Sequence, residues 1–250
     1  MSIRFQILLA IFLSPLFVSA QDDTDIPDII YNSQITGGFT MHSNGLGAFF
    51  SYGKYRGVKK VWLAGIDVVG MKHEKEIRTY NPVYEDGKSY IYGKTNNFYV
   101  LRPHIGKRKI VTMKERRSGV QFGYTWAFGP SIGITKPVYL EIGYPSIPYD
   151  YLSVERYDPE KHFFDDIYGR ASGLRGLSQL KIHPGAFAKF GLNFEYSSIR
   201  DRLKGLEVGA VLDLYPKTIP IIAPEFVEKN RQYFLTFYLN VFFGRKYIQR

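Results

Sequence analysis

The feature that most constrains the fold is a two-residue alternation in the C-terminal stretch QYFLTFYLNVFFG. One face is wholly apolar, with Tyr233, Leu235, Phe237, Leu239, Val241 and Phe243, whereas the other is mixed, with Phe234, Thr236, Tyr238, Asn240, Phe242 and Gly244. A helix would instead scatter the polar residues through an apolar cylinder, and the aromatic content favours a strand. The pattern predicts a strand of roughly ten or more residues, in a soluble sandwich or in a barrel whose outside meets lipid.

The same alternation recurs along the chain and brings the predicted strand count to eight. The other seven candidates are Gln34 to His42, Gly45 to Lys54, Val58 to Gly70, Asn97 to Gly106, Val120 to Phe128, Ala186 to Tyr196 and Gly205 to Tyr215. In the last of these an unbroken apolar face from Leu206 to Leu214 alternates with Gly205, Glu207, Gly209 and Asp213. A soluble sandwich would hide its apolar face and expose Lys, Glu and Thr, not repeated Gly. This inverted polarity favours a membrane barrel.

The connections between the candidates alternate in length. One end has Tyr55 to Gly57, Lys107 to Ser118 and Ser198 to Leu203, and the other has Ser43-Asn44, Met71 to Thr95, about Ser131 to His183, and Pro216 to Arg231. Short periplasmic turns and long outer loops are typical of outer-membrane barrels. Val138 to Tyr144 also alternates, but the prolines on both sides place it in the long outer loop. The sequence therefore predicts an all-β fold, an antiparallel up-and-down transmembrane β-barrel of eight strands with long extracellular loops, over residues 33–250.

Residues 1–20 have the layout of a secretory signal peptide, with Arg4 ahead of an apolar run from Ile7 to Val18 and a small-residue cleavage site near Ala20. Residues 21–32 would be a periplasmic linker. Cleavage leaves 230 residues (250 less 20) and lowers the net charge from +10 to +9, because the signal carries Arg4 and no acid. The chain has no cysteine, which excludes disulfides and thiol chemistry. The predicted location is the outer membrane of a Gram-negative bacterium.

Charged residues fall on the inward face of the predicted barrel. They are Asp67, Arg102, His104, Lys189, Glu195, Glu207 and Asp213. An eight-stranded barrel has room for side chains but not for an aqueous channel. Because unpaired buried charges are costly, we expect these groups to form a salt-bridged network, with a proton or ion path as the alternative. A porin is not expected.

Catalytic and metal-binding candidates lie at the outer rim and in the long outer loop. His42 and Ser43 occupy an outer turn and His183 begins a strand at the same end, so that a base and a hydroxyl could meet there, although no spacing motif supports catalysis. The candidate metal ligands are Asp158, Glu160, His162, Asp165 and Asp166. They lack the glycine and ligand order of a calcium loop, and a solvated, helix-forming acidic loop is the alternative. No cofactor is predicted.

Two further segments indicate contacts. The stretch from Gly106 to Arg117 carries six Lys or Arg and one Glu. Nucleic acid is implausible for an exported barrel, so this stretch would meet anionic headgroups or an acidic partner, or serve only as a solvated turn. IPIIAPEF, from Ile219 to Phe226, is either a cap over the barrel mouth or a contact surface for another protein.

The chain resembles small outer-membrane β-barrel proteins of the Bacteroidota, which mostly have no assigned function. The resemblance is carried by KTNNFYVLRP, FGPSIGITKPVYLEI, RYDPEKH, IYGRASGLRGL and FFGRKY, and it spans most of the chain after the signal peptide. It implies a barrel of the eight-stranded type in the outer membrane, and it brings no catalytic residues.

The predicted function is that of a non-porin barrel acting as a structural or accessory subunit of an envelope assembly, for secretion or membrane-protein insertion. Its partners would be outer-membrane lipid and another envelope protein. Two alternatives stay open: a lipid-modifying hydrolase with a His-based site near the outer rim, and a divalent-binding surface adhesin.

Overall fold

The computed structural model describes residues 31–114, 119–145, 147–197, 199, 201–226 and 230–248. The predicted signal peptide and all but the last two residues of the predicted linker lie outside this range, so both stay predictions. Within the described residues, no helix combines the length and hydropathy needed to cross a membrane.

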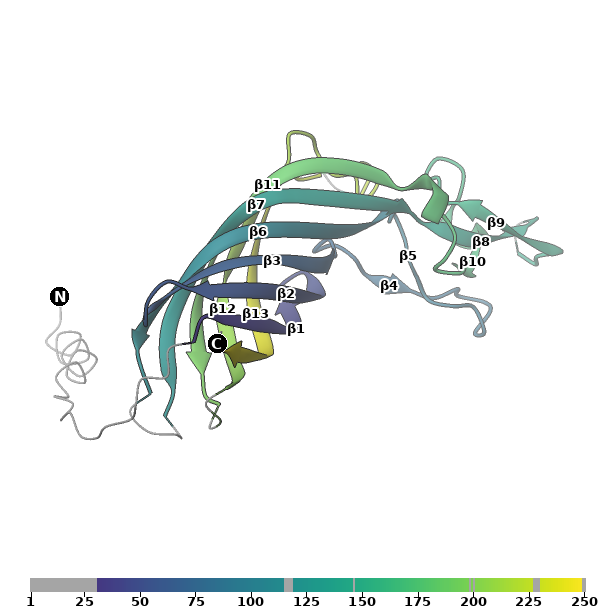
Figure 1. The fold of residues 1–250 in the computed structure, drawn as a ribbon. Helices are drawn as coiled ribbons and strands as arrows, with labels where there is room; N and C mark the ends of the chain where they lie inside the picture. Colours follow the sequence, from purple (N-terminus) through teal and green to yellow (C-terminus); the bar gives the residue numbers. More distant parts are fainter. Residues whose placement is uncertain are drawn as a thin grey trace, which may run out of the picture.

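Eight antiparallel strands close into a barrel in the order β1-β13-β12-β11-β7-β6-β3-β2 (Figure 1). They are β1 (Ser33–His42), β2 (Gly45–Tyr55), β3 (Lys60–Met71), β6 (Asn96–Thr112), β7 (Gln121–Pro137), β11 (Lys181–Glu195), β12 (Arg202–Leu214) and β13 (Tyr233–Tyr247). Each strand pairs with the neighbours before and after it in the barrel, and β13 closes the ring on β1. The predicted fold class, an antiparallel eight-stranded barrel, is confirmed.

The alternation that predicted the strands also sets their two faces. In β13, Leu235 and Phe237 are exposed on the outside, whereas Thr236, Tyr238 and Asn240 are buried in the interior. The exterior is therefore apolar and the interior polar, which is the reverse of a soluble sandwich and the arrangement of membrane-spanning barrels.

The largest departures from the predicted boundaries lie in β7, β11 and β6, and β12 also begins earlier than predicted, at Arg202. β7 continues through Ser131 to Pro137, a stretch expected in the outer loop, because it pairs on both sides, with the start of β6 and with the start of β11. For the same reason β11 begins at Lys181 and not at Ala186. β6 runs on through Lys107 to Thr112, which was expected to be a turn, since its lysines alternate outward while the backbone stays paired with β3 and β7.

Two small sheets stand beyond one end of the barrel, at the right of Figure 1. One is the hairpin of β4 (Arg78–Thr79) and β5 (Tyr90–Ile91). The other, which we call the loop sheet, has the order β10-β8-β9 and consists of β8 (Tyr139–Tyr144), β9 (Tyr151–Arg156) and β10 (Ile167–Arg170). The prediction that Val138 to Tyr144 lies outside the barrel wall is confirmed.

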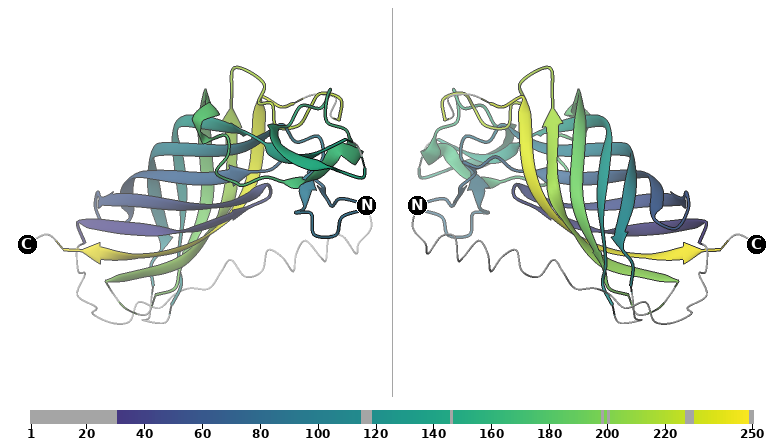
Figure 2. Two further views of the ribbon diagram at one scale, coloured as in Figure 1. Left: turned by 90° about the vertical axis from the view of Figure 1, so that its right-hand side faces the viewer. Right: turned by 90° about the vertical axis from the view of Figure 1, so that its left-hand side faces the viewer.

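The two 3-10 turns of the chain's described part, η2 (Phe164–Asp166) and η3 (Leu177–Gln179), flank β10. Both views in Figure 2 show the barrel strands wrapped round one another with the small sheets at a single end. We call this the long-loop end, because the connections 72–95, 138–180 and 215–232 meet there.

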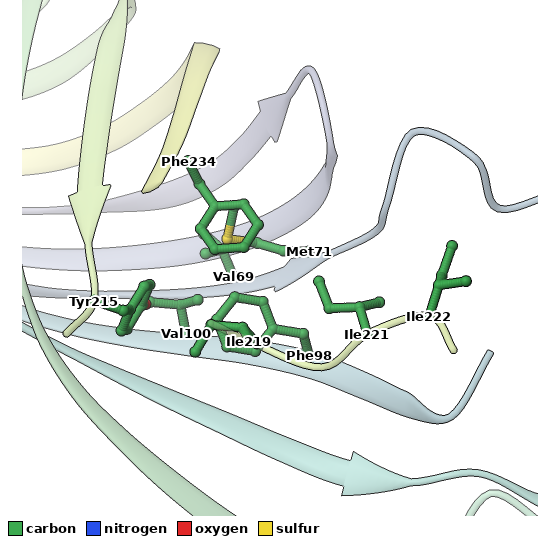
Figure 3. Packing of buried hydrophobic residues seen from close by; sticks show 9 residues of the cluster. All are labelled: Val69, Met71, Phe98, Val100, Tyr215, Ile219, Ile221, Ile222 and Phe234. Carbon is green, nitrogen blue, oxygen red and sulfur yellow. The ribbon is translucent and has the colours of Figure 1, made fainter. Parts of the chain in front are cut away.

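Residues 216–226, the cap, fold over the mouth of the barrel at the long-loop end. Ile219, Ile221 and Ile222 are almost fully buried, in one cluster with residues of the barrel wall (Figure 3). The wall residues are Val69, Met71, Phe98, Val100, Tyr215 and Phe234. Backbone hydrogen bonds from Thr95 and Asn96 to the Ile221 carbonyl tie the cap to the start of β6. Of the two readings of IPIIAPEF, the structure bears out the cap.

Candidate functional site

An ion pair lies beneath the cap, in the lumen of the barrel. The Arg102 guanidinium donates two hydrogen bonds to Asp213, at 2.9 Å from Nε and 2.6 Å from Nη2. Asp213 is wholly buried, and its Oδ1 also accepts from the Ser131 hydroxyl at 2.7 Å. This fork geometry and the added hydroxyl satisfy a carboxylate that would be costly to bury alone.

The centre of the lumen is held by Lys189, which bridges two carboxylates. Its Nζ lies 3.2 Å from Asp67 and 3.5 Å from Glu207. Glu207 Oε1 also accepts hydrogen bonds from the Tyr238 hydroxyl at 2.8 Å and from Asn240 at 3.3 Å. Each carboxylate therefore has a cation beside it, and loss of Lys189 would leave Asp67 with no Lys or Arg beside it among the described residues.

A third cluster closes the opposite end of the lumen. Glu195 Oε1 lies 3.0 Å from Lys114 Nζ and 3.0 Å from Lys246 Nζ, and Gln121 donates to Oε2 at 3.4 Å. Arg108 belongs to the central cluster, with its Nη2 3.6 Å from Glu207 Oε2. Charge pairs thus run along the barrel from the cap to the far end.

All seven residues of the predicted lumen network are buried in the interior. His104 is the least engaged of them, with Nδ1 3.7 Å from Asp67 and 3.2 Å from the Arg102 carbonyl. Sequence reasoning missed Arg108, Lys114 and Lys246 as partners. The signal was present for Lys246, which falls on the inward alternation of β13, but it was not visible for Lys114, which lies beyond the last residue of β6.

The outside of the barrel carries a continuous set of exposed apolar side chains. Among them are Phe39, Met41, Leu46, Phe50, Ile66, Val68, Ile105, Phe128, Phe190, Leu212, Leu235 and Phe237. Lys107 lies on this surface between two indoles, with its Nζ 4.2 Å from the ring centre of Trp62 and 5.5 Å from that of Trp126. Amphipathic rings beside a cation are typical of a position at the level of lipid headgroups.

The candidate catalytic residues do not assemble into a base and nucleophile pair. The Ser43 hydroxyl donates to Asn44 Oδ1 at 2.8 Å, and His42 Nδ1 accepts from the Asn44 backbone N–H at 3.3 Å, so each is engaged by the turn itself. His183 Nε2 lies 3.0 Å from the Thr135 hydroxyl across the β7–β11 pair. A hydrolase built on these residues stays a prediction, with no orienting carboxylate hydrogen-bonded to either imidazole in the described part of the chain.

The candidate metal ligands are spread along the connection between β9 and β10. His162 Nε2 lies 3.2 Å from Glu155, Asp158 pairs with Lys161 at 3.4 Å, and Asp166 accepts from the Phe163 backbone N–H at 3.2 Å. Nowhere among the described residues do three or more His, Asp or Glu side chains converge in a way that could hold a metal ion. The segment forms a turn at 159–161 and the single 3-10 turn η2 in place of a longer helix.

The loop sheet has an open edge. β8 lies between its two neighbours, so β9 is paired on one side only. Tyr151, Leu152 and Val154 of β9 are all exposed. An unpaired edge strand with exposed apolar side chains is a template for another strand.

No protein-family model matches the chain, and no curated protein matches it. The resemblance to barrels of the Bacteroidota therefore stays a prediction. Among solved structures, the chain is similar to the neisserial surface protein A, at 9% identity and a TM-score of 0.39, over 86% of this chain and 96% of that one.

Two further solved structures are similar to the chain. They are Ail, the attachment invasion locus protein of Yersinia pestis (7% identity, TM-score 0.40, 87% and 99% covered), and the outer membrane protein OprG from Pseudomonas aeruginosa (11%, 0.34, 88% and 97%). At these identities and TM-scores the likeness supports no function, and the fold assignment rests on the strand pairing.

Proposed function

We propose that the protein is a non-porin barrel of the Gram-negative outer membrane, which serves as a structural or accessory subunit of an envelope assembly for secretion or membrane-protein insertion. The barrel is its anchor and the long-loop end is the part that meets other molecules.

Placement in a membrane is supported by the apolar exterior. The exposed side chains on the outside of β13 and β2, such as Phe237 and Phe50, have no protein to pack against in the monomer. Contiguous apolar surface of this extent marks a membrane or protein contact. A β-barrel satisfies every backbone group between its strands, which is the condition for crossing lipid.

The single observation that carries the proposal is the sealed interior. Paired charges fill the lumen, and Ile219 and Ile221 cover its mouth. A barrel closed in this way offers no passage for solutes, so its contacts with other molecules are made by its surface. The exposed edge of β9 supplies a surface suited to another protein.

The test is a pull-down of the tagged protein from its native outer membrane in mild detergent. We expect a stoichiometric protein partner that is lost when Leu152 and Val154 on the β9 edge are both replaced by Asp. The control is Ile77→Asp, which changes an apolar side chain that is even more exposed and lies outside the loop sheet. Recovery of a lone monomer, or equal loss of the partner with the control, would contradict the proposal.

The sealed interior has its own test in planar lipid bilayers. The wild-type protein is expected to give no stable ion conductance. Steady open-channel currents would show that the lumen passes solutes and that the protein functions as a porin.

A further inference from the structure

A cavity of about 240 Å³ lies at the long-loop end, between the β4–β5 hairpin and the loop sheet. Its wall is assembled from segments that are far apart in the sequence: the ends of β3 and β7, the start of β6, and the residues that follow β10. It is distinct from the lumen, and none of the sequence-predicted site residues lines it. We call it the basic pocket.

The wall of the basic pocket is strongly cationic. Its basic residues are Lys72, Arg78, Lys94, Lys136, Arg170 and Arg175, and its one acid is Glu76. Glu76 is already committed, because its Oε2 lies 2.7 Å from Lys94 Nζ and both side chains are nearly buried. Six positive charges less one negative leave a formal excess of five around one cavity.

The remaining five cations have no carboxylate partner in the part of the chain that the structure describes. Among the described residues, no Asp or Glu oxygen lies within 4.0 Å of the side-chain nitrogens of these five residues. Lys136 is the most telling of them, since the residue is only 7% exposed and its ammonium donates to the Gly173 carbonyl. An ammonium buried without a counter-ion is costly, and it retains two further N–H donors. An anion that enters the pocket would supply the counter-ion that Lys136 lacks.

The chemistry of the wall indicates which class of anion the pocket would bind. Arginine forks match the oxygens of phosphate, and a phosphate monoester carries about −1.5 to −2 charges at neutral pH, which suits several cations around one point. Neutral groups stand beside the cations: the Ser89 and Ser172 hydroxyls, the Asn97 amide and the Tyr139 ring. Hydroxyl and amide groups beside an aromatic ring are suited to the hydroxyls and the face of a sugar.

We propose that the basic pocket binds a phosphorylated saccharide, with the phosphate on the Arg and Lys side chains and the sugar hydroxyls on Ser89, Ser172 and Asn97. The volume agrees with one sugar ring and its phosphate, since a cavity of about 150 Å³ holds a benzene ring. The phosphate has two sources, a soluble sugar phosphate or the phosphorylated sugar of a glycolipid in the outer leaflet. Both present the same chemistry to the pocket.

The experiment is isothermal titration of the full-length protein in neutral detergent, in a phosphate-free buffer, with glucose 6-phosphate, glucose and inorganic phosphate in turn. A second arm places the protein in nanodiscs that contain either phosphorylated or dephosphorylated lipid A. We expect binding of glucose 6-phosphate that exceeds binding of glucose and of inorganic phosphate. Preference for phosphorylated lipid A without binding of the soluble sugar would also support the pocket and would assign the glycolipid as the source.

The matched variants are Arg175→Gln in the pocket and Lys217→Gln in the connection between β12 and β13. Both residues are exposed basic side chains, and Lys217 does not line the pocket. Arg175→Gln is expected to weaken binding about tenfold, the loss of one charge-assisted contact, and Lys217→Gln to leave it unchanged. Arg170→Gln provides a second pocket variant if Arg175→Gln is poorly folded.

Three results would overturn the proposal: no binding in either arm, glucose bound as tightly as its phosphate, or equal losses in the pocket and control variants. Inorganic phosphate bound as tightly as glucose 6-phosphate would overturn the assignment to a saccharide. None of these results depends on the envelope partner, so failure here is distinct from failure of the pull-down.

Discussion

The lumen and the basic pocket both collect Lys and Arg side chains, but they balance the charge differently. In the lumen, five cations (Arg102, Arg108, Lys114, Lys189, Lys246) stand with four carboxylates (Asp67, Glu195, Glu207, Asp213), and every one of these groups has an opposite charge within 4.0 Å. In the basic pocket, six cations stand with one carboxylate, and among the described residues Lys94 is the one cation paired with it.

The difference distinguishes structural charge, meaning charged groups that stabilise the fold, from binding charge, meaning charged groups available to a ligand. Groups that pair with opposite charges inside a barrel hold its strands in register, and their charges are already balanced without a ligand. In the basic pocket Lys136 is buried without a carboxylate partner among the described residues, at a cost that an incoming anion offsets, whereas the exposed Arg and Lys side chains of the wall remain available to bind that anion. The same residue type therefore supports the fold in one region and recognition in the other.

The largest effect should come from removing the cation at the centre of the lumen. Lys189→Met leaves Asp67 with no Lys or Arg beside it among the described residues and leaves Glu207 with Arg108 alone, and breaking a buried pair in this way costs about 3–5 kcal/mol. The measurement is urea unfolding in detergent, followed by the fluorescence of Trp62 and Trp126. Adding Asp67→Asn to Lys189→Met should recover part of the loss, and an unchanged unfolding midpoint in the single variant would show that these charges do not support the fold.

A smaller effect is expected at the cap. Ile219 is wholly buried against the barrel mouth, and Ile219→Ala should cost about 2 kcal/mol, the low end for such a truncation because the cap can open locally. Hydrogen exchange should show faster exchange of the amide of Ile221 and its neighbours, with the barrel amides unchanged. Ile77→Ala, at an exposed position, is the control. Equal protection of the cap in the wild type and the variant would contradict its role as a packed lid.

The smallest effect is a pH dependence at the long-loop end. Burial, together with the nearby Arg231, lowers the pKa of His73 below its usual 6.5. The neutral imidazole is favoured in the folded state, and its Nδ1 accepts from the Lys75 backbone N–H at 3.1 Å. This contribution to stability is fully present above pH 6.5 and is lost as the pH falls through the lowered folded-state pKa.

The check is thermal unfolding between pH 7 and pH 5. His73→Asn should flatten the profile, because Asn can accept the same backbone hydrogen bond without titrating. A profile as steep in the variant as in the wild type would assign the pH dependence to other groups.

The barrel was predictable from the sequence because its signal is local. Successive side chains of a strand point to opposite faces of the sheet, so the inward positions of Asp67, Lys189 and Asp213 follow once the strand is recognised. The boundaries were harder, since β7 continues to Pro137, paired with β11 as far as Thr135 and with β6 from Ile132 on, and Val138 alone separates it from β8 of the loop sheet. Two successive strands of alternating residues give no local signal of where the barrel ends.

The basic pocket was not predictable, because its wall joins residues from 72 to 175 through loops whose paths no periodicity encodes. Lys136 and Arg175, for example, are unremarkable as sequence and meet only when β7 and the segment after β10 are folded. Alternation predicts on which face of a sheet each residue lies. It does not predict which loops meet, so a site between loops is recognised only from the three-dimensional structure.

The most direct test of the contrast is a crossed measurement on one arginine from each region. Arg102→Met and Arg175→Gln are each assayed for urea unfolding and for glucose 6-phosphate binding. We predict that Arg102→Met lowers stability by about 3–5 kcal/mol and, where it is folded, still binds the ligand, whereas Arg175→Gln keeps its stability within about 0.5 kcal/mol and loses about tenfold in affinity. Two results would contradict the division between structural and binding charge. One is that Arg175→Gln destabilises the barrel but binds normally, and the other is that Arg102→Met leaves stability unchanged.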